Sequence, residues 1–365
     1  MKYVDEFRNK ALIKKLAARI ARIMPSRKVT IMEVCGTHTQ SFFRFGIDGI
    51  LPADLRLIAG PGCPVCVSPQ EYIDRAVELA QNEFNIIATF GDMLRVPGST
   101  STLEKERAKG GNVIVLYSAL DSLKIARRNP AKNVIFLAVG FETTAPTIAL
   151  SILAASREKL KNLFFFSSLK TIPPAMHHLV CDRKLNLDGF LCPGHVSTII
   201  GSAAYQPLSR KFSIPCCVTG FEPFDLMEGI YMLLRQITKG RHAFVANQYQ
   251  RAVSRSGNRR ALKVLREVFK TTDASWRGLG VIPGSGLGIR SEFGAFNAEK
   301  VFSFARSRSR TSAVQKRCRC GDVLKGLILP TQCPLFFKAC RPDNPVGPCM
   351  VSSEGACNAY YKYRR

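Results

Sequence analysis

The stretch Val29-Thr30-Ile31-Met32-Glu33-Val34-Cys35-Gly36-Thr37-His38-Thr39 sets a pattern that recurs along the chain. A short apolar, β-branched run ends in a turn that carries cysteine and glycine, and a helix-like segment follows. This order is typical of a strand, turn and helix in a parallel α/β sheet. The same pattern predicts strands at residues 29–34, 55–59, 86–90, 113–117, 134–139, 163–166, 189–191 and 216–219.

These strands are enough for two four-stranded sheets, so we expect an α/β protein with two Rossmann-like domains that face a cleft. Arg127-Arg128-Asn129-Pro130 interrupts the pattern and predicts a boundary between domains at 28–129 and 130–240. Glycine and proline become frequent after Gly278, which predicts a loop-rich third domain at 241–365. Residues 1–27 should hold an amphipathic helix that packs on this third domain, with one apolar face formed by Phe7, Leu12, Ile13, Leu16 and Ile20.

Composition indicates a globular protein, with 46% hydrophobic and 22% charged residues in 365. No apolar run reaches the roughly 18 residues that a membrane helix needs, and the charged N-terminus does not resemble a signal peptide. We therefore expect a cytoplasmic protein whose thiols stay reduced. The net charge is +26, and basic residues gather at 251–270, 306–310 and 316–317. Without interleaved aromatic residues, these segments favour a solvated basic face, which could contact an acidic protein, over a nucleic-acid site.

Most of the thirteen cysteines fall into groups, and the largest group lies near the C-terminus. Loops rich in proline and glycine bury little, so a bound metal would have to organise this segment. Four thiolates suit an iron-sulfur cluster or zinc, and the lack of paired Cys-x2-Cys knuckles favours the cluster. The predicted ligands are Cys333, Cys340, Cys349 and Cys357, with Cys318 and Cys320 as alternative ligands or bystanders.

Cys63 and Cys66 form a Cys-Pro-Val-Cys pair between a predicted strand and a predicted helix. A helix N-terminus lowers the pKa of a nearby thiol, so this position favours a redox-active dithiol. Half of a zinc site has the same spacing, but no second Cys-x2-Cys pair lies near in the sequence.

Cys35 stands on the first strand-end turn, where Gly36 permits close approach and a thiolate could bind low-spin iron. The alternative is a buried apolar cysteine. Further polar residues that follow predicted strands would line the same cleft. Glu142 and His195 are candidate proton donors and acceptors, although His195 could be structural and Glu142 could cap a helix. The other candidate cleft residues are Thr37, His38, Thr39, Asp92, Thr143, Thr144 and Glu222.

Taken together, several motifs resemble the HypD family of hydrogenase maturation factors, from about residue 30 to the end of the chain. They are Cys35-Gly36-Thr37-His38-Thr39, Pro61-Gly62-Cys63-Pro64-Val65-Cys66, Gly140-Phe141-Glu142-Thr143-Thr144-Ala145-Pro146, Pro193-Gly194-His195-Val196-Ser197, Thr219-Gly220-Phe221-Glu222-Pro223, Trp276-Arg277-Gly278-Leu279-Gly280 and Cys349-Met350-Val351-Ser352-Ser353-Glu354-Gly355-Ala356-Cys357.

This resemblance implies a scaffold that assembles the Fe(CN)2CO group of nickel-iron hydrogenase. HypC would share the iron, HypE would supply cyanide, and the hydrogenase large subunit would be an indirect partner. By the same resemblance Cys35 holds the iron, Cys63 and Cys66 form the redox dithiol, and the C-terminal cysteines hold a [4Fe-4S] cluster. A free-standing iron-sulfur dithiol reductase is the alternative, but it leaves Cys35, Glu142 and His195 without a role.

Three features depart from what this family leads us to expect. Phe337 stands where glycine is expected, Arg341 stands where threonine is usual, and residues 165–171 look divergent. These differences concern local loop shape and partner affinity, because none removes a proposed ligand.

Overall fold

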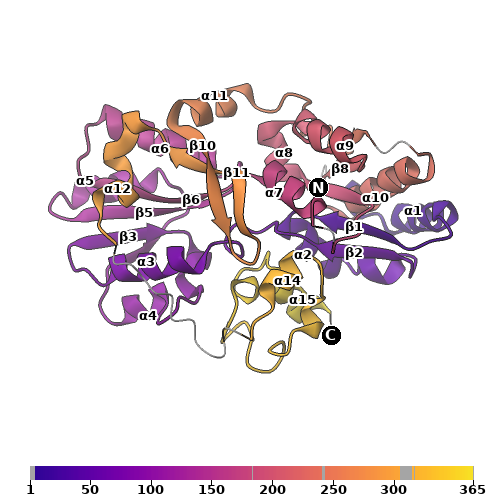
Figure 1. The fold of residues 1–365 in the computed structure, drawn as a ribbon, viewed down its shortest axis with the longest axis horizontal. Helices are drawn as coiled ribbons and strands as arrows, with labels where there is room; N and C mark the ends of the chain where they lie inside the picture. The colour runs from indigo at the N-terminus through magenta and orange to yellow at the C-terminus, as the bar shows by residue number, and fades with distance from the viewer. Residues whose placement is uncertain (1–4, 183, 241–242, 305–314, 316, 365) are drawn as a thin grey trace.

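A computed structural model describes residues 5–182, 184–240, 243–304, 315 and 317–364, and it confirms the α/β class with two parallel sheets (Figure 1). One sheet has the order β2-β1-β7-β8-β9 and the other the order β4-β3-β5-β6. All eight predicted strands are present, and β9 is an additional one. The bounds are β1 (Val29–Glu33), β2 (Leu55–Ala59), β3 (Asn85–Thr89), β4 (Val113–Val115), β5 (Asn133–Gly140), β6 (Leu163–Leu169), β7 (Gly189–Pro193), β8 (Cys216–Thr219) and β9 (Val245–Asn247).

The two sheets do not follow the predicted boundary near residue 130. β1 pairs in parallel with β7, with Glu33 opposite Leu191, while β3 pairs with β5. The chain therefore enters the first sheet, crosses to build the second, and returns to complete the first. Domains at 28–129 and 130–240 are wrong as a description of the sheets, because strand pairing joins segments that no local pattern connects.

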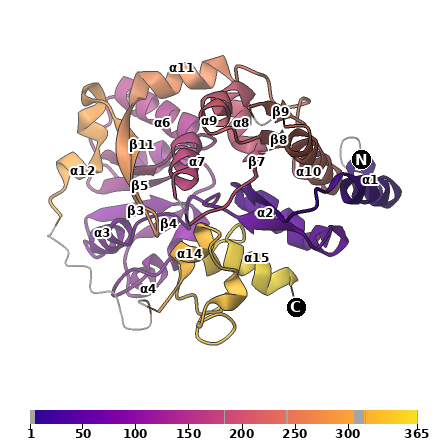
Figure 2. The same cartoon turned by 45° about the vertical axis from the view of Figure 1, so that its right-hand side comes forward.

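Helices cover the faces of both sheets (Figures 1 and 2). They begin and end close to the glycine, proline and polar residues that punctuate the sequence, and Pro lies in the first turn of α6, α7, α9 and α10. The bounds are α1 (Lys10–Ile23), α2 (Gly36–Arg44), α3 (Gln70–Ala80), α4 (Leu103–Ala108), α5 (Asp121–Arg128), α6 (Ala145–Arg157), α7 (Ile172–Val180), α8 (Gly194–Ile200), α9 (Gln206–Phe212), α10 (Pro223–Thr238), α11 (Arg259–Val268), α12 (Ala298–Val301), α14 (Cys320–Leu324) and α15 (Ala356–Tyr363).

The predicted third domain, residues 241–365, is divided among three places. β9 joins the first sheet, and α11 lies beside α6 at the second. An antiparallel hairpin of β10 (Phe269–Trp276) and β11 (Gly280–Ile289) follows. Only the last part is loop-rich, and its α15 packs on α2, where the rings of Tyr360 and Phe43 lie 4.3 Å apart. Of the predicted basic segments, residues 306–310 and 316 lie outside the described residues.

The N-terminal helix α1 packs on α10 and not on the C-terminal segment. Leu16 and Ile20 are buried in one cluster with Leu226, Ile230 and Leu233 of α10. The prediction of the apolar face is correct for these two side chains, but their partner is wrong, because amphipathicity shows which face is buried and not what covers it.

Replacing Ile20 by alanine should lower the free energy of unfolding by about 2–5 kcal/mol, because it leaves a cavity under α10. Leu12, which is 44% exposed, is the matched control and should cost less than about 1 kcal/mol. Urea denaturation followed by circular dichroism measures both variants. Equal losses would contradict the packing of α1 on α10.

Candidate functional site

The turn after β1, which carries Cys35 and Gly36, contacts two segments that are distant in the sequence. Cys35 is the N-cap of α2, and the Gly36 N–H donates to the carbonyl of Gly62, 3.1 Å away. A Cβ on Gly62 would lie 2.3 Å from the Cys35 nitrogen, and a Cβ on Gly36 would lie 2.4 Å from the Glu354 carbonyl oxygen. Both glycines are therefore needed for close approach, and they bring the Cys35 turn, the Cys63 loop and the segment 349–357 together.

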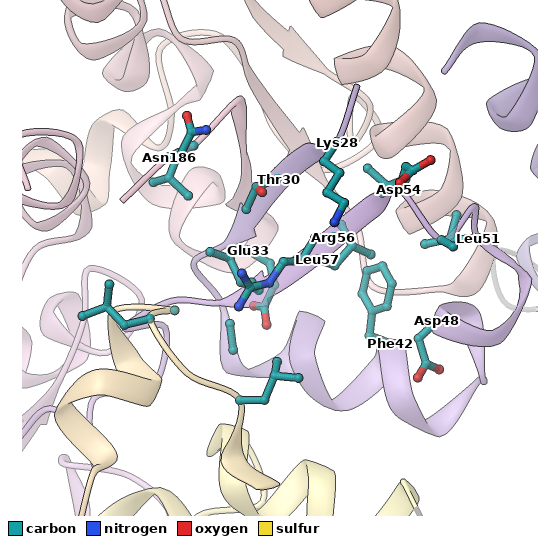
Figure 3. Close-up of a pocket in the computed structure, with 18 of the residues that line it drawn as sticks. Lys28, Thr30, Glu33, Phe42, Asp48, Leu51, Asp54, Arg56, Leu57 and Asn186 are labelled. Atoms are coloured by element: carbon teal, nitrogen blue, oxygen red, sulfur yellow. The ribbon is translucent and has the colours of Figure 1, made fainter. Parts of the chain in front are cut away.

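Glu33 is a buried acid behind Cys35 that the sequence analysis did not select. Its carboxylate accepts the Cys35 N–H at 3.3 Å and the Thr39 hydroxyl. It is 3% exposed and also lines a pocket of about 710 Å³ beside the edge strand β2 (Figure 3). An acidic residue inside an otherwise apolar strand of a parallel sheet was the signal that could have identified it.

A second acid, Glu354, lies on the other side of this turn and accepts the Thr37 hydroxyl at 2.6 Å. Burial, with smaller contributions from Glu354 and Glu33, raises the pKa of the Cys35 thiol to about 12. Cys35 therefore stays protonated at neutral pH unless a cation takes the place of its proton. Asp92 follows β3 and lies close enough to Glu354 to help raise the pKa of that carboxyl, after burial as the main cause.

Two predicted histidines flank one phenylalanine at the ends of β7 and β8. The ring of Phe221 stacks on His195, with centroids 3.9 Å apart, and lies 4.9 Å from the ring of His38. His38 Nε2 lies 3.3 Å from the Thr219 carbonyl oxygen and 3.1 Å from the Thr219 hydroxyl, so it can donate to the carbonyl or accept from the hydroxyl. Its Nδ1 is buried without a hydrogen-bond partner. Burial lowers the pKa of His38 to about 4 and also lowers the pKa of His195.

The predicted acids Glu142 and Glu222 have different surroundings. Glu142 follows β5 and accepts the Ile172 N–H at 2.9 Å, while its other carboxylate oxygen is buried without a partner. Burial raises the pKa of Glu142 to about 7, so it can exchange a proton near neutral pH. Glu222 forms a two-point ion pair with Arg8, at 2.5 and 3.0 Å, and belongs to the capping box of α10. These contacts give Glu222 a structural role at the α1–α10 junction.

Thr143 and Thr144 precede α6 and do not contribute a side-chain cap hydrogen bond to it. Thr144 packs against Gly140, where a Cβ would lie 2.5 Å from the Thr144 Cβ. Thr143 is exposed. Neither threonine side chain therefore caps α6.

Cys63 and Cys66 form the other part of the site. The Cys66 N–H donates to Cys63 Sγ at 3.3 Å, and the Cys66 thiol interacts with the thiols of Cys349 and Cys63. The expected lowering of a thiol pKa by a helix is not found for Cys66. Burial raises its pKa instead, because α3 begins only at Gln70 and leaves this thiol in an apolar interior.

Six cysteines from the C-terminal segment line one small cavity together with Phe336, Gly347 and Met350. Cys349 interacts with Cys320, Cys357 and Cys66, so it joins this cavity to the dithiol. Within the described residues no group of three or more His, Cys, Asp or Glu side chains is arranged to hold a single metal ion. The donor set still has the chemistry of an iron-sulfur site, because thiolates are the usual ligands of such clusters. The lining cysteines are Cys318, Cys320, Cys333, Cys340, Cys349 and Cys357.

The chain matches one known family over almost its whole length. The family model HypD, described as the hydrogenase formation hypA family, matches residues 11–364. The chain belongs to this family. It is 48% identical to the hydrogenase maturation factor HypD of Azotobacter vinelandii over 100% of this chain and 97% of that protein. It is also 42% identical to HypD of Escherichia coli K12 over 100% of this chain and 99% of that protein.

The HypD match includes the whole of the site, from Glu33 to Cys357. A further relative, the hydrogenase expression/formation protein HupD of Azotobacter chroococcum, is 48% identical over the full chain and 97% of its own length. Among the described residues, no helix is both long enough and apolar enough to span a membrane.

The buried His38 should make stability fall in acid. An unfolded histidine takes up a proton near pH 6.5, whereas folded His38 does so only near pH 4. Between these values the unfolded state binds more protons, so its contribution to stability is lost as pH falls from about 6.5 to 4. We expect the free energy of unfolding to be lower by up to about 3 kcal/mol at pH 4 than at neutral pH, as measured by urea denaturation.

The control for this prediction is His38→Gln, which should remove that part of the pH dependence. Glu142 changes stability with pH in the opposite direction. Its raised pKa favours the folded state at low pH, and this contribution to stability is lost as pH rises to about 7. Comparison of wild type with His38→Gln isolates the histidine. Parallel pH profiles would show that folding does not lower the pKa of His38.

Proposed function

We propose that this protein is the scaffold on which the Fe(CN)2CO group of nickel-iron hydrogenase is assembled, together with HypC and HypE. The observation that supports this best is the meeting of Cys35, the Cys63–Cys66 loop and the segment 349–357 at one edge of the first sheet. A soft ligand for iron and a dithiol are then neighbours. Ligands in open parallel sheets bind at this edge.

Cys35 is the proposed ligand of the iron, which is the cargo of this reaction. Its thiol has a raised pKa, so iron binding would release the proton and leave a thiolate, a good donor to low-spin iron. Glu33 holds the backbone N–H of Cys35 and thereby fixes the turn that presents the sulfur. Neutral His38 and His195 around Phe221 are candidate hydrogen-bonding groups for the ligands of the iron.

Reduction at this site would use the dithiol. A Cys63–Cys66 disulfide that accepts two electrons and two protons becomes two thiols, and the reverse reaction delivers the electrons to a bound substrate. A [4Fe-4S] cluster in the thiol cavity would supply single electrons when bound. Cys349, in contact with Cys66, is the residue through which the two sites touch.

The thiol contacts favour one change in the proposed ligand set. Spacing selected Cys349 as a cluster ligand, but Cys349 is the cavity cysteine that interacts with Cys66. A thiolate that stays bound to iron could not exchange with Cys66. Cys318 interacts electrostatically with Cys340 and Cys357 and can take its place. We therefore propose Cys318, Cys333, Cys340 and Cys357 as the ligands, with Cys349 free for thiol exchange.

Serine substitutions distinguish the two ligand sets. After anaerobic reconstitution, Cys318→Ser should lose most of its iron, its sulfide and the cluster absorbance near 400 nm, roughly as any Fe–S ligand variant does. Cys349→Ser should keep all three. The opposite result would restore Cys349 as the fourth ligand. Cys181→Ser, an exposed cysteine outside the cavity, is the matched control.

The function itself is tested by infrared spectroscopy of protein purified without oxygen from hydrogenase-producing cells. Wild type with its partners should show cyanide and carbonyl stretches. Cys35→Ala should lose them while keeping the cluster, because the two sites draw on different segments. Wild-type protein with an intact cluster and no such bands would favour the free-standing dithiol reductase.

A further inference from the structure

The two local departures from the expected HypD sequence, Phe337 and Arg341, form one structural unit in the loop between Cys333 and Cys340. Phe337 has φ +62°, a left-handed conformation that costs a residue with a Cβ roughly 1–2 kcal/mol. Glycine would avoid this cost. A phenylalanine kept in this conformation points to a use for its side chain.

Arg341 holds this turn in place. Its Nε donates to the carbonyl oxygens of Phe337 and Lys338, both at 3.1 Å. The Lys338 N–H in turn donates to the Leu335 carbonyl at 3.2 Å. Arg341 thus stabilises the strained conformation that Phe337 needs, so the two departures compensate each other.

The strained turn presents an aromatic surface above the thiol cavity. Phe337 is 43% exposed, and its ring centroid lies 4.6 Å from that of Phe336 and 4.6 Å from that of Tyr361. Phe336 lines the cavity together with the six cysteines. We call Phe336, Phe337 and Tyr361 the aromatic patch. It connects the solvent to the cavity wall through two rings in contact.

The charges around the patch are mainly basic. Lys338, Arg341 and Lys362 are exposed beside it, and Asp343 is the acid in the same loop. The whole chain carries +26, so a second copy of this protein would be repelled. An exposed aromatic residue in a mainly basic loop suits a protein partner with an acidic surface.

We propose that the aromatic patch, with Lys338 and Arg341, is the docking surface for an acidic one-electron carrier protein of the ferredoxin class. This inference rests on the proposed function, because a dithiol that turns over needs a supply of electrons. Reducing one Cys63–Cys66 disulfide takes two electrons and two protons. Two reduced carriers would each be oxidised by one electron, and the protons would come from solvent.

Binding is measured first, because it requires neither iron nor cyanide. A plant-type [2Fe-2S] ferredoxin, made redox-inert with gallium, is titrated into the full-length protein and followed by NMR. We expect binding that weakens at least tenfold between 20 and 300 mM salt. Lys338→Glu should weaken it about tenfold at low salt. Lys161→Glu carries the same charge change at an exposed site before β6 and should bind as wild type does.

The aromatic contribution is tested with Phe337→Gly, which removes the ring and suits the left-handed conformation. This variant should be at least as stable as wild type but bind the ferredoxin about five- to tenfold more weakly. Unchanged binding by Phe337→Gly, or equal weakening by Lys161→Glu, would overturn the proposal. So would a duplex DNA that binds with Lys338 dependence while the ferredoxin does not.

A second readout separates this inference from the proposed function. Reduced native ferredoxin should reduce the Cys63–Cys66 disulfide more slowly in Lys338→Glu and Phe337→Gly, whereas dithionite should act equally on all variants. If wild type does not bind the ferredoxin but still shows the cyanide and carbonyl bands, the docking proposal is wrong and the proposed function stands. If wild type binds the ferredoxin as expected but shows no such bands, the proposed function is wrong and the docking surface stands.

Discussion

The close backbone contact between the Gly36 and Gly62 turns is the constraint on which the site depends. The Gly36 N–H reaches the Gly62 carbonyl, and this approach requires that Gly62 has no Cβ, which would lie 2.3 Å from the Cys35 nitrogen. On its other side Gly36 touches the backbone of Glu354, so the C-terminal segment is seated against the same turn. Cys35, Cys63 and Cys349 come from three separate parts of the chain, and this contact is what makes them neighbours. A side chain at Gly62 would push the Cys63 loop away from the proposed iron ligand, whereas a side chain at Gly36 would push the segment 349–357 away from the same turn.

The strands were predictable because each is a short apolar run, and parallel strands buried on both faces produce such runs. The pairing of the strands was not predictable. β1 pairs with β7, about 160 residues further along the chain, and the local sequence of a strand does not indicate which distant strand it pairs with. The same reason explains the error about α1. Its buried side chains Leu16 and Ile20 were identified from periodicity, while their partner helix α10 was not.

Some site residues could be proposed from the sequence alone, because their side chains can bind metal or transfer protons. The structure brings some of the residues selected after strands together, such as His195 and His38 on either side of Phe221. Glu222 looked similar in sequence but pairs with Arg8, and an ion pair with a residue more than 200 positions away leaves no local signal. Glu33 could not be recognised in the same way, because polar residues after strands mark the site whereas this carboxyl lies within β1 and accepts the N–H of Cys35.

Desolvation gives the site its chemical character. Burial raises the pKa of Cys35, Cys66 and Glu33 and lowers that of His38, so each of these groups is driven toward its neutral form. In the proposed function, a neutral site would not repel a dication, and an iron ion bound to Cys35 would replace the thiol proton. Exchanging one proton for a dication adds a single positive charge to the pocket, which costs less than burying the ion without proton release. The glycine contact thus places the thiol, and burial keeps the thiol protonated at neutral pH, so that in the proposed function iron would have to displace this proton.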